Sequence, residues 1–423
     1  MTSKKTIFLM TLMTALMSIK AQAIGPRDVA SDGSPVKWAN GAVYVDVEQD
    51  VLVGSKNVSA LIDDGLSQWD DLSEADLTIT RREISADIDG TNVCEYLYAA
   101  PTCTTAEQNN GINPLIIDED GSIMCQFFCD VSGSRARYIY LGFASIALSN
   151  ATTGVAIKGG AVFNAACLEG ELQSGCSAAG ITGFSDDDFT SFMVHEMGHF
   201  LGLDHSQVNK TEAENDDDTD NNLINTMFPT FILGNGSYFK IPHADDKAAI
   251  AQLYPSTTFT SSTWTLTGNL YNTDGSTQIQ CGNIVARNVS NPRGDAISAL
   301  SGDFASAGSA DGTFQIVGLT AGASYTLDVE SIGSSYRGAS GYTPCRGSNG
   351  EAAPPSATLL PAFTSSLSFT AAAGERLNVA CTRTSTGGDC VEAAVSDGTG
   401  GSGGSSESAG GAGCSLIKNG ENN

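Results

Sequence analysis

The spacing of apolar and polar positions divides the chain into two regions with different predicted secondary structure. Between residues 58 and 69, apolar residues recur three or four positions apart, which predicts a helix. Two further helices are expected, one opening at Ser185 and one over residues 244–254. Strand-like runs are found at residues 36–47, 75–82, 113–120, 137–148 and 158–166. This order predicts an α+β domain over residues 24–255.

The second region alternates apolar and polar positions around Gly, Asp and Asn turns, and it contains no convincing helix. This pattern predicts an all-β sandwich over residues 264–390. The Ser/Thr-rich residues 256–263 are expected to form a linker between the two domains. The Gly/Ser-rich residues 391–423 are expected to form a disordered, flexible tail.

The first residues have the form of an export signal. Lys4 and Lys5 precede an apolar stretch, and the small-residue site Ala21-Gln22-Ala23 follows it, so residues 1–23 are predicted to be a cleaved signal peptide. No later segment is a candidate membrane span. The protein is therefore expected to be secreted.

Export changes the interpretation of the eleven cysteines, because disulfides form outside the reducing cytosol. Six cysteines lie between residues 94 and 176, four lie between 281 and 390, and Cys414 stands alone in the tail. This grouping predicts two separately crosslinked domains. The local pairs Cys94–Cys103 and Cys167–Cys176 are expected, although six cysteines allow fifteen pairings.

The net charge of −27 excludes some classes of partner. Nucleic acids and anionic membrane surfaces are bound through clustered Lys and Arg, which this chain does not offer. The charge favours solubility and cation binding, and it indicates no specific function.

Three of the four histidines lie between residues 195 and 205. On a helix, His195 and His199 lie on one face, one turn apart, so both can bind one metal ion. Gly202 permits a sharp turn that brings His205 back to the same ion. Three histidines leave the fourth position of zinc open to water, as in catalytic sites, and Glu196 lies where it can act as the general base. The pattern predicts zinc-dependent hydrolysis of peptide bonds.

These residues form the pattern HExxHxxGxxH, which resembles the zinc motif of the metzincin metalloproteases. Ser206 directly after the third histidine resembles the matrixin branch of that family. The segment Asn225–Pro229 is similar to the matrixin methionine turn, which implies that Met227 lies beneath the zinc. The resemblance implies a twisted mixed sheet with a long active-site helix and protein or peptide substrates.

The final helix of the first region also resembles the family. The resemblance implies that its paired acids, Asp245 and Asp246, tie the zinc site to the body of the domain. It also implies that Gly202 supports the structure of the zinc site. The resemblance covers about residues 36–255. It further implies that residues 159–165 form the sheet edge that pairs with substrate, and that residues 228–236 line the pocket for the side chain after the cut bond.

The leader between the signal peptide and the first strand departs from the matrixin pattern. Matrixins are commonly held latent by a propeptide cysteine, but this leader is only about a dozen residues long and contains no cysteine. The protein is therefore expected to lack that switch or to be controlled in another way.

Calcium is a second candidate cofactor, because matrixin-like folds generally use it and because it prefers carboxylate oxygens. Asp118 and Asp120 are one candidate pair of ligands, and Asp216, Asp218 and Asp220 in the acidic loop after His205 are another. Neither group follows the EF-hand spacing. The fourth histidine, His243, has no ligand spacing and is expected at the surface or at a helix cap.

The second region resembles the carboxypeptidase-regulatory-like β-sandwich modules of secreted proteins, through Asp311-Gly312, Phe314, Gly318-Leu319, Gly322 and Tyr325. With the tail, such a module would suit attachment to a cell surface or a polymer. It would equally suit a rival hypothesis, an exported adhesion or binding protein with a catalytically inert metal site. Glu196 argues against the rival, because a structural zinc site needs no base.

Overall fold

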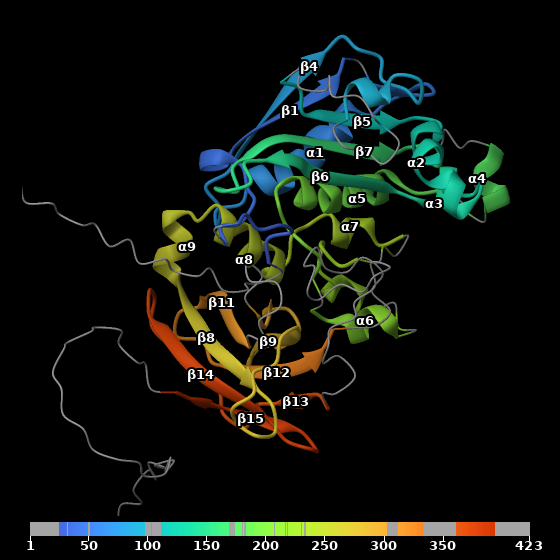
Figure 1. Ribbon diagram of the computed structural model, residues 1–423. Helices are drawn as coiled ribbons and strands as arrows, with labels where there is room; N and C mark the ends of the chain where they lie inside the picture. The colour runs from blue at the N-terminus through green and yellow to red at the C-terminus, as the bar shows by residue number, and fades with distance from the viewer. Residues whose placement is uncertain are drawn as a thin grey trace, which may run out of the picture. The chain divides into compact units, whose positions relative to one another are not determined.

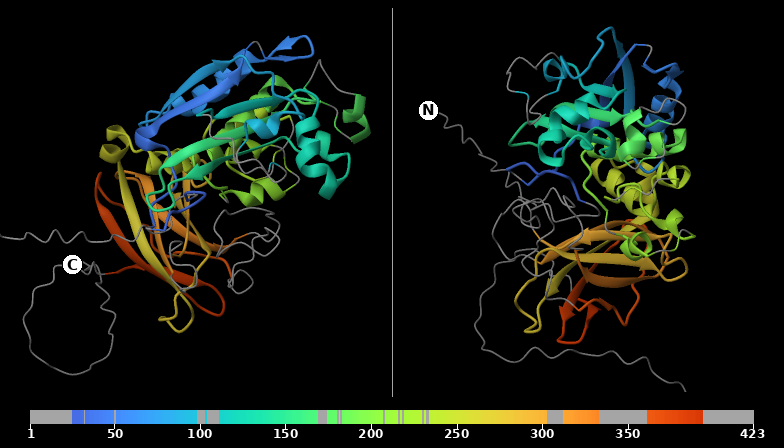
Figure 2. Two further views of the ribbon diagram at one scale, coloured as in Figure 1. Left: turned by 45° about the horizontal axis from the view of Figure 1, so that its top comes forward. Right: turned by 90° about the vertical axis from the view of Figure 1, so that its right-hand side faces the viewer.

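The structure is a computed structural model. It describes residues 25–393, except for 32, 50, 98–102, 104–110, 169–173, 180, 182, 207, 216, 218, 230, 232–233, 303–311 and 333–360. The predicted signal peptide and all but the first three residues of the predicted tail lie outside the described residues. At a coarse level the fold is α+β, as the sequence predicts, with a helix-containing N-terminal region and a C-terminal region of strands (Figures 1 and 2).

The N-terminal region is built on a five-stranded mixed sheet in the order β4-β1-β5-β7-β6. Strands β1, β4, β5 and β7 run parallel to one another, and β6 pairs with β7 in the antiparallel direction. The strands are β1 (Ala42–Glu48), β4 (Thr78–Ile84), β5 (Pro114–Asp118), β6 (Gly142–Ser149) and β7 (Ala156–Asn164), and β2 (Leu52–Val53) pairs with β3 (Lys56–Asn57) in a separate ribbon.

Two helices, α1 (Ser59–Asp70) and α5 (Asp186–Phe200), lie together on one face of this sheet (Figure 1). The indole N–H of Trp69 in α1 donates to Val194 O in α5 (2.8 Å), which fixes the two helices to each other. Ahead of β1, Trp38 donates to Phe200 O (2.8 Å) and stacks on the Phe200 ring. These contacts hold the end of α5 against the sheet.

The shorter elements connect or flank this framework, and several of them were not anticipated from the sequence. Before α5 they are η1 (Ala39–Gly41), η2 (Val93–Glu95), α2 (Ser122–Ser132), α3 (Ala136–Ile139) and α4 (Ser174–Ala179). After α5 they are α6 (Lys210–Glu214), η3 (Asn221–Leu223), α7 (Gly236–Phe239), α8 (Ala244–Leu253) and α9 (Thr257–Ser262).

The prediction that residues 159–165 form the sheet edge was wrong. Residues 159–164 belong to β7, which lies between β5 and β6, and every residue from Lys158 to Asn164 is buried. Continuous burial is typical of an interior strand with both faces covered. On this side of the sheet the edge strand is β6, which pairs with β7 alone among the described strands.

Two further boundaries differ from the sequence analysis. The expected linker at 256–263 contains α9, which begins because the Ser256 hydroxyl accepts from Phe259 N (3.1 Å) and Phe259 is buried. The strand expected from residue 137 begins only at Gly142, since Arg137–Ile139 lie in α3.

The C-terminal region has two four-stranded sheets, in the orders β10-β9-β12-β13 and β11-β8-β14-β15. Buried side chains from both sheets join one hydrophobic core, which includes Trp264, Phe314 and Tyr325. The strands are β8 (Thr263–Tyr271), β9 (Gly282–Asn288), β10 (Ala296–Leu300), β11 (Thr313–Thr320), β12 (Tyr325–Ser331), β13 (Phe363–Thr364), β14 (Arg376–Arg383) and β15 (Gly388–Glu392).

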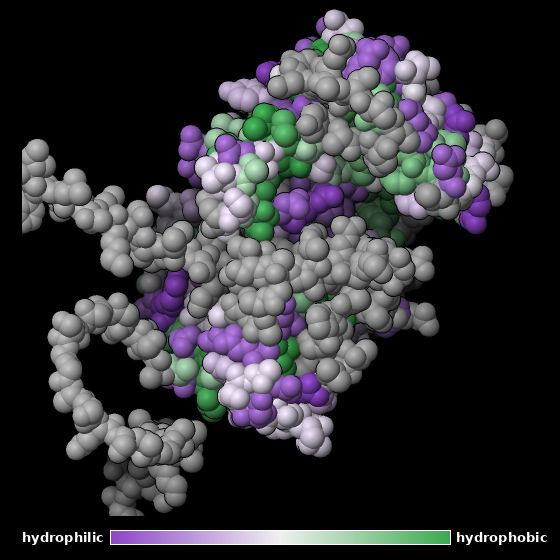
Figure 3. All heavy atoms as spheres, viewed as in Figure 1, coloured by the Kyte–Doolittle hydropathy of each residue, from purple (hydrophilic) through white to green (hydrophobic). Residues whose placement is uncertain are grey.

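The disulfides follow the predicted local pattern. Both expected pairs, Cys94–Cys103 and Cys167–Cys176, are present. Cys125–Cys129 and Cys381–Cys390 are also bonded, and Cys281 is in a disulfide as well. Cys414 lies outside the described residues. Within the described part of the chain, no helix is long and apolar enough to cross a membrane. In the coloured part of the face in Figure 3, hydrophilic and hydrophobic residues are interspersed.

Candidate metal centre

Helix α5, which carries the first two histidines, opens after Ser185, as expected from the sequence, and it begins with a capping box. Ser185 Oγ accepts from Asp188 N (3.2 Å), and the Asp188 carboxylate accepts from Ser185 N (3.1 Å). The other oxygen of Asp188 accepts from Gly234 N (3.0 Å) and Gly236 N (3.1 Å). The buried carboxylate of Asp188 thus fixes both the start of α5 and the loop at Gly234 and Gly236. The contact with that loop could not be predicted from helix spacing.

The structure brings the three predicted histidines together. The ring centroids of His195 and His199 are 4.9 Å apart, and the Nε2 atoms of His199 and His205 are 3.0 Å apart. One ligand atom from each of the three lies within 4.8 Å of the others, and no other group of His, Cys, Asp or Glu among the described residues meets this criterion.

Gly202 makes the return of His205 sterically feasible. Its φ of +103° lies in a region that L side chains rarely adopt. A Cβ there would lie 2.7 Å from Val36 O, so the site also needs a residue without a side chain. Both observations agree with the turn predicted from the sequence.

Hydrogen bonds at the Nδ1 atoms of His195 and His199 set the orientation of these two imidazole rings. His195 Nδ1 is 2.7 Å from Thr226 O, and His199 Nδ1 is 2.8 Å from Leu203 O. Carbonyl oxygens only accept, so each Nδ1 carries the proton and each Nε2 keeps its lone pair. This is the state in which a histidine binds a metal ion.

Burial keeps these imidazoles neutral. It lowers the pKa of His195 to about 4, and the nearby charge of Arg27 acts in the same direction. Burial also holds the pKa of His199 well below its usual value, and the charge of Arg27 and the repulsion from any proton on His205 or His195 act in the same direction. Protons therefore compete weakly with a metal at neutral pH.

The predicted support residues lie beneath the histidines. Met227 is fully buried and lies against α5 at Gly198, where a Cβ would overlap the Met227 sulfur. The carboxylate of Asp246 accepts from Thr226 N and Met227 N, both at 3.0 Å. Since Thr226 O orients His195, Asp246 acts on the site through this turn.

Asp245 supports the third histidine from the other side. Its buried carboxylate accepts from Ser206 Oγ (2.7 Å), in the residue directly after His205. It also accepts from Ser298 N (2.8 Å) in β10, so a strand of the C-terminal region contributes to the support. The sequence suggested Asp245 but gave no signal for Ser298.

Glu196 is partly buried beside the histidines and lies against the edge strand β6. A Cβ at Gly142 would come within 3.0 Å of Glu196 Cγ, which shows how closely the strand approaches. Burial raises the pKa of Glu196 to about 7, against the opposing effects of the Arg27 charge and of a hydrogen bond from the main chain of Ala144. A carboxylate with a pKa near neutrality can accept and return a proton.

A cavity of about 330 Å³ opens beside His195 and Glu196. Its walls include Phe192 from α5 and three phenylalanines from the segment after Met227, namely Phe228, Phe231 and Phe239. The segment expected to line a substrate pocket therefore does line a cavity next to the histidines. The cavity lining is largely apolar and aromatic, as is typical of ligand sites.

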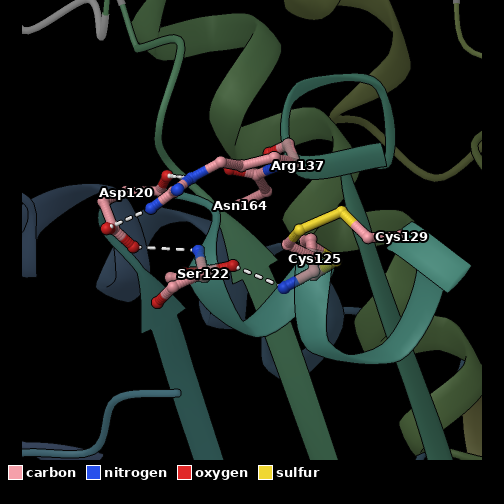
Figure 4. The surroundings of a disulfide bond; sticks show 8 residues. Asp120, Ser122, Cys125, Cys129, Arg137 and Asn164 are labelled. Carbon is pink, nitrogen blue, oxygen red and sulfur yellow. Dashed lines mark hydrogen bonds and ion pairs between the residues drawn. A yellow bond between two sulfur atoms is a disulfide. The ribbon is translucent and has the colours of Figure 1, made fainter. Parts of the chain in front are cut away.

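Asp118 and Asp120, one candidate pair of calcium ligands, line the same cavity, but they belong to no group of three metal-binding side chains among the described residues. Asp120 pairs with Arg137 and accepts from Ser122 N (2.8 Å), as Figure 4 shows, while Asp118 accepts from Met124 N (2.8 Å). These contacts stabilise the turn that leads into α2.

In the acidic loop, Asp220 pairs with Arg293 (2.6 Å) of the C-terminal region. Asp216 and Asp218 lie outside the described residues. Calcium binding therefore stays a prediction. His243 occupies the N-cap position of α8 and belongs to no metal group, in agreement with its expected capping place.

Comparison with known proteins adds no identification. No protein-family model matches the chain, and no curated protein matches it. The resemblance to matrixins accordingly stays a prediction from the sequence.

Proposed function

We propose that this protein is a secreted zinc-dependent endopeptidase of the matrixin-like metzincin type. One observation carries the proposal: the carboxylate of Glu196 lies beside three converging imidazoles and next to an apolar cavity. An inert metal site would need the imidazoles alone, whereas hydrolysis also needs the base and room for a substrate.

The donor set fits zinc better than a hard cation. Three imidazole nitrogens suit zinc and its transition-metal neighbours, while calcium and magnesium prefer oxygen. Ring nitrogens of His195, His199 and His205 would hold the ion, and the Nδ1 contacts of His195 and His199 orient those two rings. A zinc ion there supplies Lewis-acid activation of water and of a substrate carbonyl group.

The residues of the chain then have distinct tasks. Glu196 takes a proton from water and passes it to the nitrogen of the leaving amine. Strand β6 is the sheet edge beside Glu196, so its main-chain groups can pair with an extended peptide. Because such pairing uses the backbone, it tolerates many substrate sequences.

Substrate preference would come from the cavity. A space of about 330 Å³ walled by phenylalanines favours a large apolar side chain and disfavours a charged one, which would be desolvated without a partner. The proposed enzyme therefore cuts before a large aliphatic or aromatic residue.

The remaining parts of the chain suit an extracellular enzyme. The signal-like N-terminus and the disulfides fit an oxidising compartment. The two C-terminal sheets with their shared core are proposed to be a β-sandwich module that, with the tail, attaches the enzyme to a surface or polymer.

A peptide-library cleavage profile, with and without a chelator, tests the proposal. Cleavage before large apolar residues, abolished by chelation and restored by zinc, is expected. If no peptide is cut by the zinc-loaded protein, the proposal fails and the adhesion or binding hypothesis is favoured.

A further inference from the structure

The leader that follows the predicted signal peptide lies against the metal centre. Arg27 N donates to Gly202 O (2.8 Å), and Asp204 N donates to Gly25 O (3.3 Å). Between these contacts, Pro26 forms an antiparallel bridge with Leu203. The leader is thus paired, like a short strand, with the turn that connects His199 to His205.

The side chain of Arg27 extends from this pairing to the edge strand. Its guanidinium donates to the carbonyl oxygen of Ala144 in β6. The main-chain N–H of Ala144 is hydrogen-bonded to the carboxylate of Glu196. In an antiparallel pair, residues alternate between those bonded to the neighbouring strand and those whose main-chain groups point outward. The contacts with Arg27 and Glu196 show that Ala144 points outward, toward the metal centre.

This position has two consequences for the site. The carbonyl of Ala144 is a main-chain acceptor that an extended peptide would need in order to pair with β6, and Arg27 already occupies it. The guanidinium also places a positive charge close to the metal centre, because it bonds the carbonyl of the same residue, Ala144, whose N–H meets Glu196, and because the main chain of Arg27 is bonded to the turn between His199 and His205. A fixed cation there opposes the binding of a divalent metal ion.

We propose that residues 25–29, here termed the leader clasp, form an autoinhibitory contact that must leave before an extended peptide can pair with β6. The clasp does without a thiol: Arg27 blocks the edge carbonyl and weakens metal binding by charge repulsion. The part of this proposal that concerns peptide cleavage rests on the proposed function. The effect of Arg27 on metal binding can be measured whether or not the protein is a peptidase.

Arg27→Ala in the full mature chain tests the clasp, with Arg376→Ala as the matched control, since Arg376 is an exposed arginine at the start of β14. Two quantities are measured: the Kd for zinc, by competition with a chromogenic chelator, and kcat/KM for a peptide from the library. The Arg27→Ala variant is expected to bind zinc several-fold more tightly and to cleave with a several-fold lower KM. The control should match the parent in both.

A second variant that lacks residues 24–28 separates the charge from the pairing. It should cleave at least as well as Arg27→Ala, because it also frees the turn at Gly202–Asp204. Arg27→Lys keeps the charge and should retain the weaker zinc binding of the parent.

The outcomes distinguish the two proposals. Tighter zinc binding in Arg27→Ala without cleavage by any variant supports the clasp and refutes the peptidase. Unchanged or weaker zinc binding, together with a lower kcat/KM, overturns the clasp and makes Arg27 a residue that assists the reaction.

Discussion

Replacement of Asp246 by alanine tests the proposed support of the metal centre. Asp246 is fully buried and accepts three main-chain hydrogen bonds, from Thr226 N (3.0 Å), Met227 N (3.0 Å) and His243 N (2.8 Å). The variant would leave three buried donors without their partner. Each such donor costs about 1–3 kcal/mol, and relief of the buried carboxylate offsets part of the loss, so we expect a destabilisation of about 3–5 kcal/mol.

Thermal unfolding of the metal-free protein, followed by circular dichroism, provides the assay. For the N-terminal region, whose size is about 150–250 residues, the expected loss of unfolding free energy corresponds to a fall in Tm of roughly 6–20 °C. The exposed Asp71 at the end of α1 supplies the control, and Asp71→Ala should leave the Tm nearly unchanged. Zinc affinity should also fall in Asp246→Ala, because Thr226 O orients His195. A Tm within about 2 °C of the control would refute this account of the turn, since it would mean a loss of at most about 1 kcal/mol.

Three further predictions concern pH, metal and the C-terminal sheets. Burial raises the pKa of Glu48 to about 7, so the folded protein holds this proton more tightly than the unfolded chain does. Stability should therefore fall as pH rises from about 4.5 to about 7, and Glu48→Gln should flatten the dependence of Tm on pH. Saturating zinc should raise the Tm of the parent, because zinc binds only the folded protein. In His199→Ala most of that rise should be lost, and addition of a chelator should return the Tm of the parent to its zinc-free value. Ser298→Ala removes a hydroxyl that donates to Asp245 (3.0 Å) and should cost about 1–2 kcal/mol in denaturant unfolding, with no change if that contact contributes nothing.

The local features of the site could be predicted from the sequence because they depend on spacing alone. Positions four apart share a helix face, so His195 and His199 converge, and Gly202 permits the turn that returns His205. The capping box at Ser185 was predictable for the same reason. Cysteines nine residues apart in the chain were also sensible partners.

Features that depend on contacts between distant segments could not be predicted in this way. The order of β6 and β7 in the sheet follows from strand pairing, which an apolar run does not specify. The sequence likewise gave no sign that Arg27 reaches Ala144, or that Asp220 pairs with Arg293. The spacing of apolar and polar residues identifies which residues share a face of a helix or strand. It does not identify which side chains from distant segments contact that face.

The most direct test of the central claim compares the parent with Glu196→Gln, both loaded with zinc. The amide preserves the shape of the side chain but accepts no proton at neutral pH, so zinc content should remain stoichiometric while kcat for a cleaved peptide falls by at least about a hundredfold. A Glu196→Gln protein that binds zinc and still cleaves at the rate of the parent would contradict the assignment of Glu196 as the base.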